Sequence, residues 1–335
     1  MKEKLLTVCS SIKGFFVKLF SKKETVSEEL GATTMQERDM KKVASSQQVM
    51  KVLVQVMLYL FLGIMALIIL FPFYWMIISS LKSPEEYRAT IPTFWPREIM
   101  WENYKSAFEV ANLGTLFKNT VIVGVVSTIL SLVITVLSAF AFARLEFKGK
   151  NALFAALLAT MMIPGELFTI TNYETVYIFK NHEVLKNFFS WMGPDTYGVL
   201  IVPFLVSVFY IYLLRQNFMQ IPNELYLAAK VDGTSDLKYL WKVMIPLALP
   251  TLISITILKM MGAWNSYVWP NLVTTKDDYE LITNGLRNAF TDTSGMTNYP
   301  EQMAAVATVS APLFLVFIFL RKYIMKGVSR SGIKG

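Results

Sequence analysis

Two charged residues lie inside stretches of the sequence that are otherwise apolar. Lys259 lies within residues 247–269, and Glu166 follows a Pro-Gly pair within residues 152–170. Charged side chains are expensive in hydrocarbon, so those inside a membrane span often contact a transported substrate or ion. A structural lysine that pairs locally or extends to the interface explains Lys259 equally well, and a position near the outer interface explains Glu166 better.

Three polar aromatic and amide residues follow Lys259 along the chain. Trp264 and Tyr267 offer flat faces on which sugar rings stack, and Asn265 offers an amide for sugar hydroxyls. Aromatic belts at the ends of membrane spans contain the same residue types, and the sequence favours that explanation. Together with Lys259 and Glu166, these residues are the candidates for a substrate pathway.

The composition excludes most catalytic and metal sites. The chain has one cysteine, Cys9, and one histidine, His182, which stand in unrelated segments. No intrachain disulfide is possible, and we expect no metal site and no catalytic residue. The sequence has no Gly-rich phosphate loop with its Lys-Ser/Thr, so ATP and Mg²⁺ are expected to bind on another subunit and no cofactor on this one.

A hydrophilic segment, residues 221–250, separates two apolar stretches. Pro222 suits the first position of a helix, and Gly233 suits the left-handed position just past a helix end. About three turns of helix are therefore expected between them. A second helix is expected to start near Ser235, a suitable N-cap, and to stop at Pro246.

One side of the first of these helices has the composition of a docking face. Its residues follow the i, i+3, i+4, i+7 spacing: Leu225, Ala228, Ala229 and Asp232. The alanines remove bulk, so another protein surface could approach the backbone closely. The segment is predicted to lie outside the membrane and to dock on a partner.

The rest of the chain reads as an all-α integral membrane protein. Hydrophobic residues make up 54% of it and charged residues 17%, whereas ordinary soluble domains approach a quarter charged. Six apolar segments approach or exceed the length of a crossing, apart from the third, which is broken at Pro164. They are residues 52–81, 119–143, 152–170, 197–214, 247–269 and 303–320.

Two domains are expected, residues 1–51 and 52–335. The first has apolar residues at helical spacing among many lysines, which suits a basic amphipathic helix on an anionic leaflet. A partly disordered basic tail explains the same segment equally well. Residues 171–196 form an aromatic-rich outer insert between the third and fourth spans.

The basic residues orient the spans. With both termini in the cytoplasm, the inner segments carry 22 Lys or Arg and the outer loops 9, although their lengths are similar. This asymmetry follows the positive-inside rule and places residues 221–250 in the cytoplasm. The net charge of +8 is thus explained by membrane topology, and no nucleic-acid partner is expected.

The hydrophilic segment resembles the EAA loop of ABC importer permeases. Ala228-Ala229, then Gly233, then residues 243–246 keep the spacing of that motif, although Leu227 stands where the family has a glutamate. Glu224 supplies an acid one turn earlier. Other segments resemble the carbohydrate-importer branch, and most closely the second permease subunit of maltose-type systems: residues 95–96, 103–104, 119–120, 162–164, 264–270 and 326–335.

The resemblance implies a function and a set of partners. A six-span permease would pair with a second permease, sit on two copies of an ATPase subunit and receive an oligosaccharide or related sugar from an extracellular binding protein. A coupling helix would connect it to the ATPase through Glu224, Ala228, Ala229, Asp232, Gly233 and Pro246. A glycerol-phosphate importer is the first alternative. An ion-coupled secondary transporter, which should show paired broken spans, is the second, and a membrane-embedded enzyme lacks a catalytic set.

Overall fold

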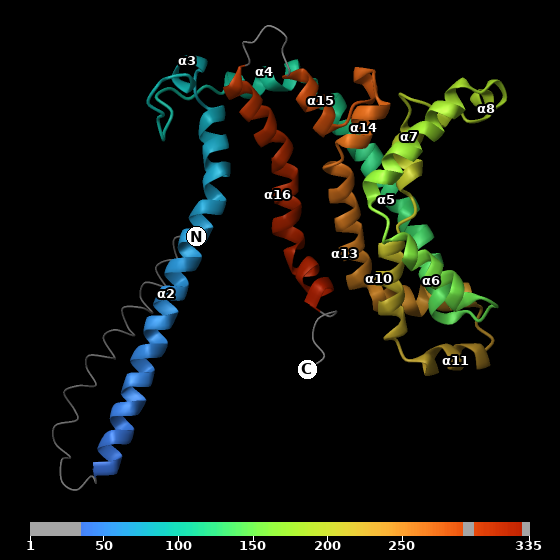
Figure 1. Cartoon of the computed structure of the whole chain (residues 1–335), viewed down its shortest axis with the longest axis horizontal. Helices are drawn as coiled ribbons and strands as arrows, with labels where there is room; N and C mark the ends of the chain where they lie inside the picture. The colour runs from blue at the N-terminus through green and yellow to red at the C-terminus, as the bar shows by residue number, and fades with distance from the viewer. Residues whose placement is uncertain (1–34, 291–297, 330–335) are drawn as a thin grey trace. The chain divides into compact units, whose positions relative to one another are not determined.

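The computed structural model of the chain describes residues 35–290 and 298–329, and every regular element in these ranges is a helix (Figure 1). This confirms the all-α class for the part of the chain that is described. Most of the predicted basic extension, residues 1–34, lies outside the described residues, as does the end of the chain after Ser329. The chain divides into two compact units, Met1–Pro72 and Phe73–Gly335.

Helix α2 (Met35–Ser80) makes up the described part of the first unit and ends inside the second. Its portion Met50–Ser80 is long and apolar enough to cross a membrane, in agreement with the first predicted span. In the second unit, the Asn103 side-chain amide donates to the carbonyl oxygens of Ser80 and Lys82, both at 2.9 Å. These bonds satisfy carbonyls that the helix end leaves open.

Three further helices are long enough to span a membrane: α5 (Leu113–Arg144), α13 (Ile245–Trp264, with the turns before it) and α16 (Tyr299–Ser329). Two bent helix pairs each have the combined length and composition of one more span. The described residues therefore contain four to six candidate spans, a range that includes the predicted six.

The predicted third span is broken, as expected. Helices α6 (Lys150–Thr160) and α7 (Gly165–Asn181) meet at an angle of 93°. Pro164 immediately precedes α7, where its fixed φ and missing N–H are tolerated. Because α7 runs well past residue 170, the first part of the predicted outer insert is a continuation of this helix. The insert continues with α8 (Glu183–Phe188) and a 3₁₀ turn, Ser190–Met192.

The predicted fourth span also contains a break, which corrects the prediction of a single uninterrupted segment 197–214. It consists of α9 (Tyr197–Ile201), a 3₁₀ turn (Val202–Phe204) and α10 (Val208–Met219), with a bend of 48°. Pro203 lies in the 3₁₀ turn, and the Ser207 hydroxyl caps α10 by accepting the N–H of Tyr210 at 3.5 Å. Both residues signal a break, but the apolar run around them conceals it.

The helix predicted to stop at Pro246 continues instead. Helix α12 (Asp236–Tyr239) passes through a π-helical turn, Leu240–Met244, into α13. A proline inside a helix clashes with the carbonyl four residues earlier, and here that residue belongs to the wider π turn. Pro246 is therefore accommodated in the first turn of α13. The fifth span ends at Trp264 rather than at residue 269, and a short helix α14 (Val268–Val273) follows.

Helix α5 packs against α10 and α13 in the second unit. Beside apolar residues such as Val123 and Phe140, its buried face contains a series of small or polar residues: Asn119, Thr120, Gly124, Ser127, Thr128, Ser131 and Thr135. Small residues let membrane helices approach closely. A Cβ added at Gly124 would lie 2.9 Å from Sδ of Met260 on α13, so the end of that flexible side chain would have to shift.

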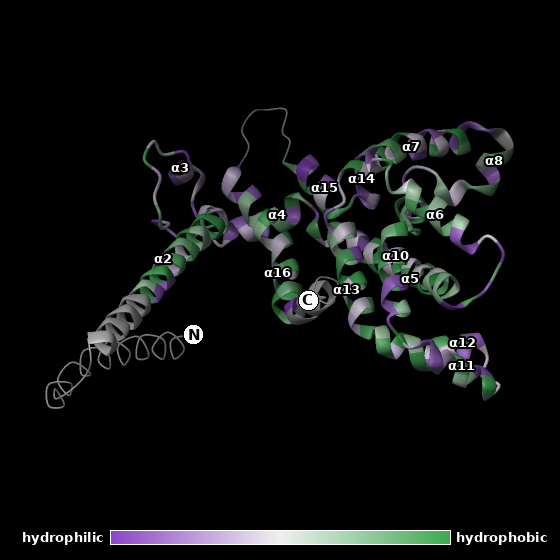
Figure 2. Ribbon diagram, turned by 60° about the horizontal axis from the view of Figure 1, so that its bottom comes forward, coloured by the Kyte–Doolittle hydropathy of each residue, from purple (hydrophilic) through white to green (hydrophobic). Residues whose placement is uncertain are grey.

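The hydrophilic segments lie at the two ends of this helical unit. Helix α11 (Asn223–Val231) is at one end in Figure 1, and α4 (Glu102–Val110), α14 and α15 (Ile282–Ala289) are at the other. Helix α3 (Pro84–Tyr87) and a 3₁₀ turn (Asp277–Tyr279) complete the described elements. Figure 2 shows hydrophobic residues along the long helices and hydrophilic residues in α11, α12, α15 and the connecting loops.

Candidate functional site

Helix α11 is the helix predicted between Pro222 and Gly233, and its exit has a defined geometry. Pro222 stands one residue outside the helix as its N-cap, rather than at its first position. Gly233 has φ +70°, the left-handed conformation that the sequence predicts. The N–H of Gly233 donates to Lys230 O at 3.0 Å, and the N–H of Thr234 donates to Ala229 O at 2.8 Å. This pair of bonds is a Schellman motif, which fixes the direction of the chain after the helix.

The inner side of α11 packs against the core of the second unit. Tyr226 and Ala229 contact a cluster that includes Phe140 and Tyr239. The Tyr226 ring centroid lies 6.5 Å from that of Phe140 and 5.2 Å from that of Tyr239, and its hydroxyl donates to Asp236 Oδ1 at 2.8 Å. Ala229, which the sequence places on the docking side, is thus half-buried and supports the helix.

An ion pair joins α11 to the helix that follows it. Lys230 Nζ lies 2.7 Å from Asp236 Oδ1. The hydrogen bond to Asp236 raises the pKa of the Lys230 ammonium, so this group stays protonated at neutral pH. Since Tyr226 contacts both partners, the loop 221–236 is held as one body by local contacts.

Arg144 holds the entry of the loop, a role that the sequence did not suggest. Its buried guanidinium Nη2 donates to Phe218 O at 2.9 Å and to Ile221 O at 2.5 Å. Phe218 is in the last turn of α10, whose carbonyls have no partner within the helix. The bonds link the end of α5 to the point at which the chain turns toward α11. The sequence carries one signal, a basic residue that closes the second predicted span, but this signal alone indicates only the topology.

The outer side of α11 is exposed and largely apolar. Val231 is 88% exposed and Leu227 is 55% exposed. The predicted docking residues Glu224, Ala228 and Asp232 are exposed as well. Apolar side chains rimmed by charged ones are typical of surfaces that bind another protein.

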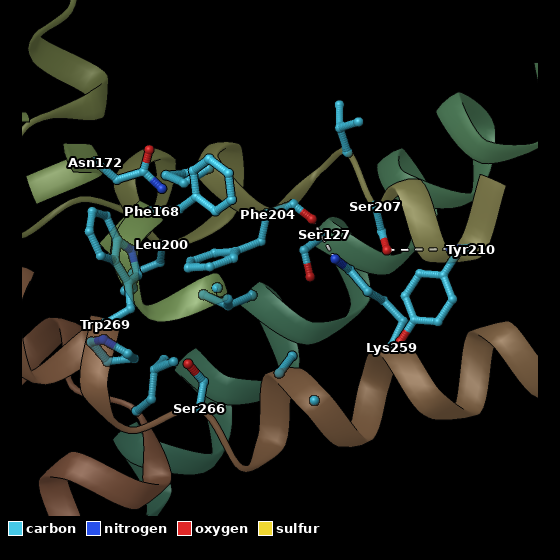
Figure 3. Close-up of a pocket in the computed structure, with 18 of the residues that line it drawn as sticks. Ser127, Phe168, Asn172, Leu200, Phe204, Ser207, Tyr210, Lys259, Ser266 and Trp269 are labelled. Carbon is cyan, nitrogen blue, oxygen red and sulfur yellow. Dashed lines mark hydrogen bonds between the residues drawn. The ribbon is translucent and has the colours of Figure 1, made fainter. Parts of the chain in front are cut away.

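A second candidate site is a cavity of about 620 Å³ lined by residues of α5, α7, α10 and α13 and of the turn after α9 (Figure 3). Lys259 extends into it from α13, and its ammonium donates to the main-chain oxygen of Phe204. The other lining side chains that Figure 3 labels are polar or large and apolar: Ser127, Asn172, Ser207, Tyr210, Ser266, Phe168, Leu200, Phe204 and Trp269. The volume is in the range of small-molecule sites.

The other predicted pathway residues lie elsewhere among the described residues. Trp264 is 7% exposed and packs in a core cluster, with its ring 5.8 Å from that of Phe117. Asn265 is exposed and donates back to Met261 O at 2.9 Å, and the Tyr267 hydroxyl accepts from Arg287. Glu166 is exposed in the first turn of α7. Of the five candidates, the structure brings Lys259 to the cavity.

The acidic residues do not form a metal centre in the part of the chain that the structure describes. Asp195, for example, binds main-chain groups: it accepts the N–H groups of Thr275 at 2.6 Å and Lys276 at 2.9 Å, and the Thr275 hydroxyl at 2.8 Å. Burial alone would raise the pKa of Asp195, but these hydrogen bonds outweigh it and lower the pKa below its ordinary value. The carboxylate holds the loop after α14 and is not free for a ligand.

The chain resembles characterised transport proteins over most of its length. It is 28% identical over 273 residues to the arabinooligosaccharides transport system permease protein AraQ of Halalkalibacterium halodurans, covering 81% of this chain and 93% of the relative. It is 26% identical to the sn-glycerol-3-phosphate transport system permease protein UgpE of Yersinia pestis, and the match covers 82% of this chain and 95% of the relative. It is 28% identical to the diacetylchitobiose uptake system permease protein NgcG of Streptomyces coelicolor, with 79% and 84% covered.

The fold is shared with a solved transporter. A chain of a bacterial ABC transporter involved in the import of the acidic polysaccharide alginate matches with a TM-score of 0.68 and 22% identity, covering 88% of this chain and 99% of that chain. A second structure, the alginate transporter in complex with an alginate pentasaccharide-bound periplasmic protein, matches with a TM-score of 0.55 and 14% identity, covering 85% and 97%. Residues 30–330 match one sequence family. The chain, a multi-pass membrane protein, therefore belongs to the family of binding-protein-dependent transport system inner membrane components.

Proposed function

We propose that this chain is a permease subunit of an ATP-driven importer that carries an oligosaccharide or a related sugar across the cell membrane. The observation that carries the proposal is helix α11, a rigid helix with an exposed apolar side at one end of a helical membrane unit. The relatives named for arabinooligosaccharides and diacetylchitobiose support a sugar substrate.

In this proposal α11 is the coupling helix. Its exposed side, with Glu224, Ala228 and Asp232, enters a socket on an ATPase subunit, while Ala229 packs inward. Gly233 fixes the helix exit, and Pro246 lies where the following segment enters α13. Closure of the ATPase dimer then moves α11, and the contacts of Arg144 and of Tyr226 transmit the movement to α5 and α13 as a rigid-body rotation.

The remaining partners follow from the family. A second permease subunit would complete the pore, two ATPase copies would bind ATP and Mg²⁺, and an extracellular binding protein would deliver substrate to the outer loops. This subunit would catalyse no reaction and hold no cofactor or metal. The solved alginate transporter that shares the fold was captured with a periplasmic protein, which supports the last of these partners.

The docking surface is tested by Val231→Asp. Because Val231 is 88% exposed, the change leaves the core of this subunit intact and places a carboxylate in the apolar surface. We expect at least a tenfold loss of ATPase subunit co-purified with the permease from mild detergent, which corresponds to about 1.4 kcal/mol of binding. Pull-down with quantification of both subunits measures it.

The matched control is Ile91→Asp, at a residue that is 80% exposed but far from α11 in the sequence, in the loop after α3. It should leave ATPase binding unchanged. Equal recovery of the ATPase with Val231→Asp and with the unaltered chain would contradict docking through α11.

The proposed topology places both termini and α11 in the cytoplasm. Cysteines introduced at Ser235 and at Glu98 in a Cys9→Ser background should then react from opposite faces of the membrane, because both positions are exposed at opposite ends of the sequence-predicted spans. A membrane-impermeant maleimide added to intact cells should label Glu98→Cys and leave Ser235→Cys unlabelled until the cells are opened. Labelling of both in intact cells would refute the orientation.

Two alternatives are separated by one transport experiment. The relative named for sn-glycerol-3-phosphate favours a small anionic substrate as the second candidate, whereas the family match weighs against an ion-coupled transporter. Proteoliposomes that contain the complete complex should take up at least one labelled sugar from a panel of neutral oligosaccharides (arabinotriose, diacetylchitobiose) and acidic ones when ATP is supplied on the side of the ATPase. Uptake driven by an ion gradient without ATP would overturn the proposal, and uptake of glycerol 3-phosphate alone would select the second candidate.

A further inference from the structure

Lys259 is a cation in a membrane helix whose environment offers it no carboxylate. Among the described residues, no aspartate or glutamate lies within 4.0 Å of its ammonium, and the residues that line the cavity around it include no other charged side chain. Its hydrogen bond to Phe204 O uses one of the three N–H groups of the ammonium. Because the ammonium has no carboxylate partner among these residues, its remaining donors favour a ligand that brings negative charge.

A structural explanation accounts for part of this arrangement. Phe204 belongs to the 3₁₀ turn in the broken fourth span, where carbonyl groups lack helical partners. Lys259 satisfies one of them and so ties α13 to that break. A neutral donor such as a serine or asparagine would satisfy a single carbonyl at a lower cost of burial. The hydrogen bond to Phe204 O therefore explains neither the positive charge of Lys259 nor the cavity beside it.

The walls of the cavity suit a carbohydrate. The rings of Phe168 and Phe204 supply flat apolar faces, and Ser207 and Asn172 supply a hydroxyl and an amide at the same cavity. Pockets that bind small molecules combine an apolar lining with a few convergent polar groups in this way. One cation among such groups matches a sugar that carries one acidic group.

We propose that the cavity around Lys259 is a binding site for the anionic group of a sugar, a carboxylate or a phosphate monoester, with Lys259 as its counter-ion. The site deepens the proposed importer function, on which it rests, by assigning a class of cargo to this subunit. The ammonium pairs with the anion, the rings of Phe168 and Phe204 contact the sugar face, and Ser207 binds a hydroxyl group. A neutral sugar lacks the group that Lys259 recognises.

Charge-selective labelling tests the site without requiring transport. Ser207→Cys in a Cys9→Ser background places a thiol in the cavity lining. In permeabilised membranes that contain the complete complex, its reaction rate with the anionic reagent sulfonatoethyl methanethiosulfonate is divided by that with the cationic trimethylammonium analogue. Lys259→Met should lower this ratio about tenfold, as expected for removal of one nearby charge, and Lys259→Arg should keep it. An unreactive thiol, or an unchanged ratio in Lys259→Met, overturns the proposal.

Ligand protection is the second measurement, and it uses matched pairs of probes. Galacturonate should slow labelling of Ser207→Cys and galactose should not, if the site takes a carboxylate. Glycerol 3-phosphate should slow it and glycerol should not, if the site takes a phosphate. Protection by neither anion in the chain that retains Lys259 overturns the proposal.

These measurements require the assembled complex but do not depend on uptake. If Lys259→Met fails to assemble, the protection by an anion in the chain with native Lys259 still decides the question. Failure of the importer function would appear as absence of ATP-driven uptake for every sugar, whereas failure of this site would leave neutral-sugar uptake in place and abolish protection.

Discussion

Replacing Gly233 by valine is expected to uncouple ATP hydrolysis from uptake in the assembled complex. Gly233 has φ +70°, a conformation that costs a non-glycine residue about 1–3 kcal/mol and that β-branched residues adopt least readily. No atom lies within 4 Å of the position that a Cβ would take, so the side chain itself fits and the cost comes from the backbone. The strain is relieved when the Schellman bonds of Thr234 and Gly233 open, which releases the C-terminal end of α11.

The measurement is the ratio of sugar taken up to ATP hydrolysed in proteoliposomes. We expect this ratio to fall about tenfold in Gly233→Val, which corresponds to roughly 1.4 kcal/mol between the coupled and uncoupled arrangements. Gly233→Asn is the matched control, since asparagine is the residue other than glycine that tolerates this conformation best. Its ratio should stay near that of the unaltered chain. A normal ratio in Gly233→Val would mean that the exit geometry of α11 is not used in coupling.

Replacing Arg144 by methionine is expected to give the largest loss of stability of any single change at the loop. Methionine keeps the apolar bulk but removes both donors, and hydrogen bonds from a charged group contribute about 1.5–3 kcal/mol each. The oxygens of Phe218 and Ile221 lose these partners at a buried position. A loss of about 3 kcal/mol lowers the midpoint of thermal unfolding by roughly 4 °C in a chain of 335 residues, because the unfolding entropy is about 2.1 cal/mol/K per residue.

Two variants separate this role from a general effect of charge. Arg144→Lys keeps the charge but lacks the forked guanidinium that reaches two carbonyls. Its melting temperature should therefore lie between that of Arg144→Met and that of the unaltered chain. Arg215→Met removes a single main-chain bond, to Phe142 O at 3.1 Å, together with the stacking of the guanidinium 4.1 Å from the Phe154 ring centroid. Its melting temperature should fall less than that of Arg144→Met, because one main-chain hydrogen bond is lost instead of two. Equal melting temperatures for Arg144→Met and the unaltered chain would contradict the assignment.

The parts of the fold that local residue chemistry decides could be predicted from the sequence. The break at Pro164, the helix before Gly233 and the positive φ of Gly233 depend on the residue types at those positions. The prediction that the helix stops at Pro246 was wrong, because it considered only the residue type of proline and not the backbone geometry before it. The π turn before it makes room for the proline ring, and no pattern in the residues 240–244 indicates such a turn.

Packing across distant segments could not be predicted. Hydrophobicity identifies α13 as a span but does not say which of its faces meets α5, so the sequence leaves both Lys259 and Trp264 among the pathway candidates. In the structure Lys259 extends into the cavity, whereas Trp264 packs against Phe117 of α5. The partners of Arg144 are more than seventy residues away in sequence, and their carbonyl groups are common to every residue, so composition carries no trace of the contact.

The π-helical turn at Leu240–Met244 determines the direction in which the side chains of α13 point. A π turn adds one residue to a helix, and one residue is about 100° of rotation at 3.6 residues per turn. Counted from Asp236, each side chain of α13 therefore points about 100° away from the direction that an uninterrupted α-helix would give it. The five residues of the π turn, which follow α11 and α12 in the chain, thus determine the orientation of Lys259 toward the cavity, although Lys259 lies near the opposite end of the same span. Loss of a single residue from this turn would keep the helix and turn Lys259 to a different neighbour.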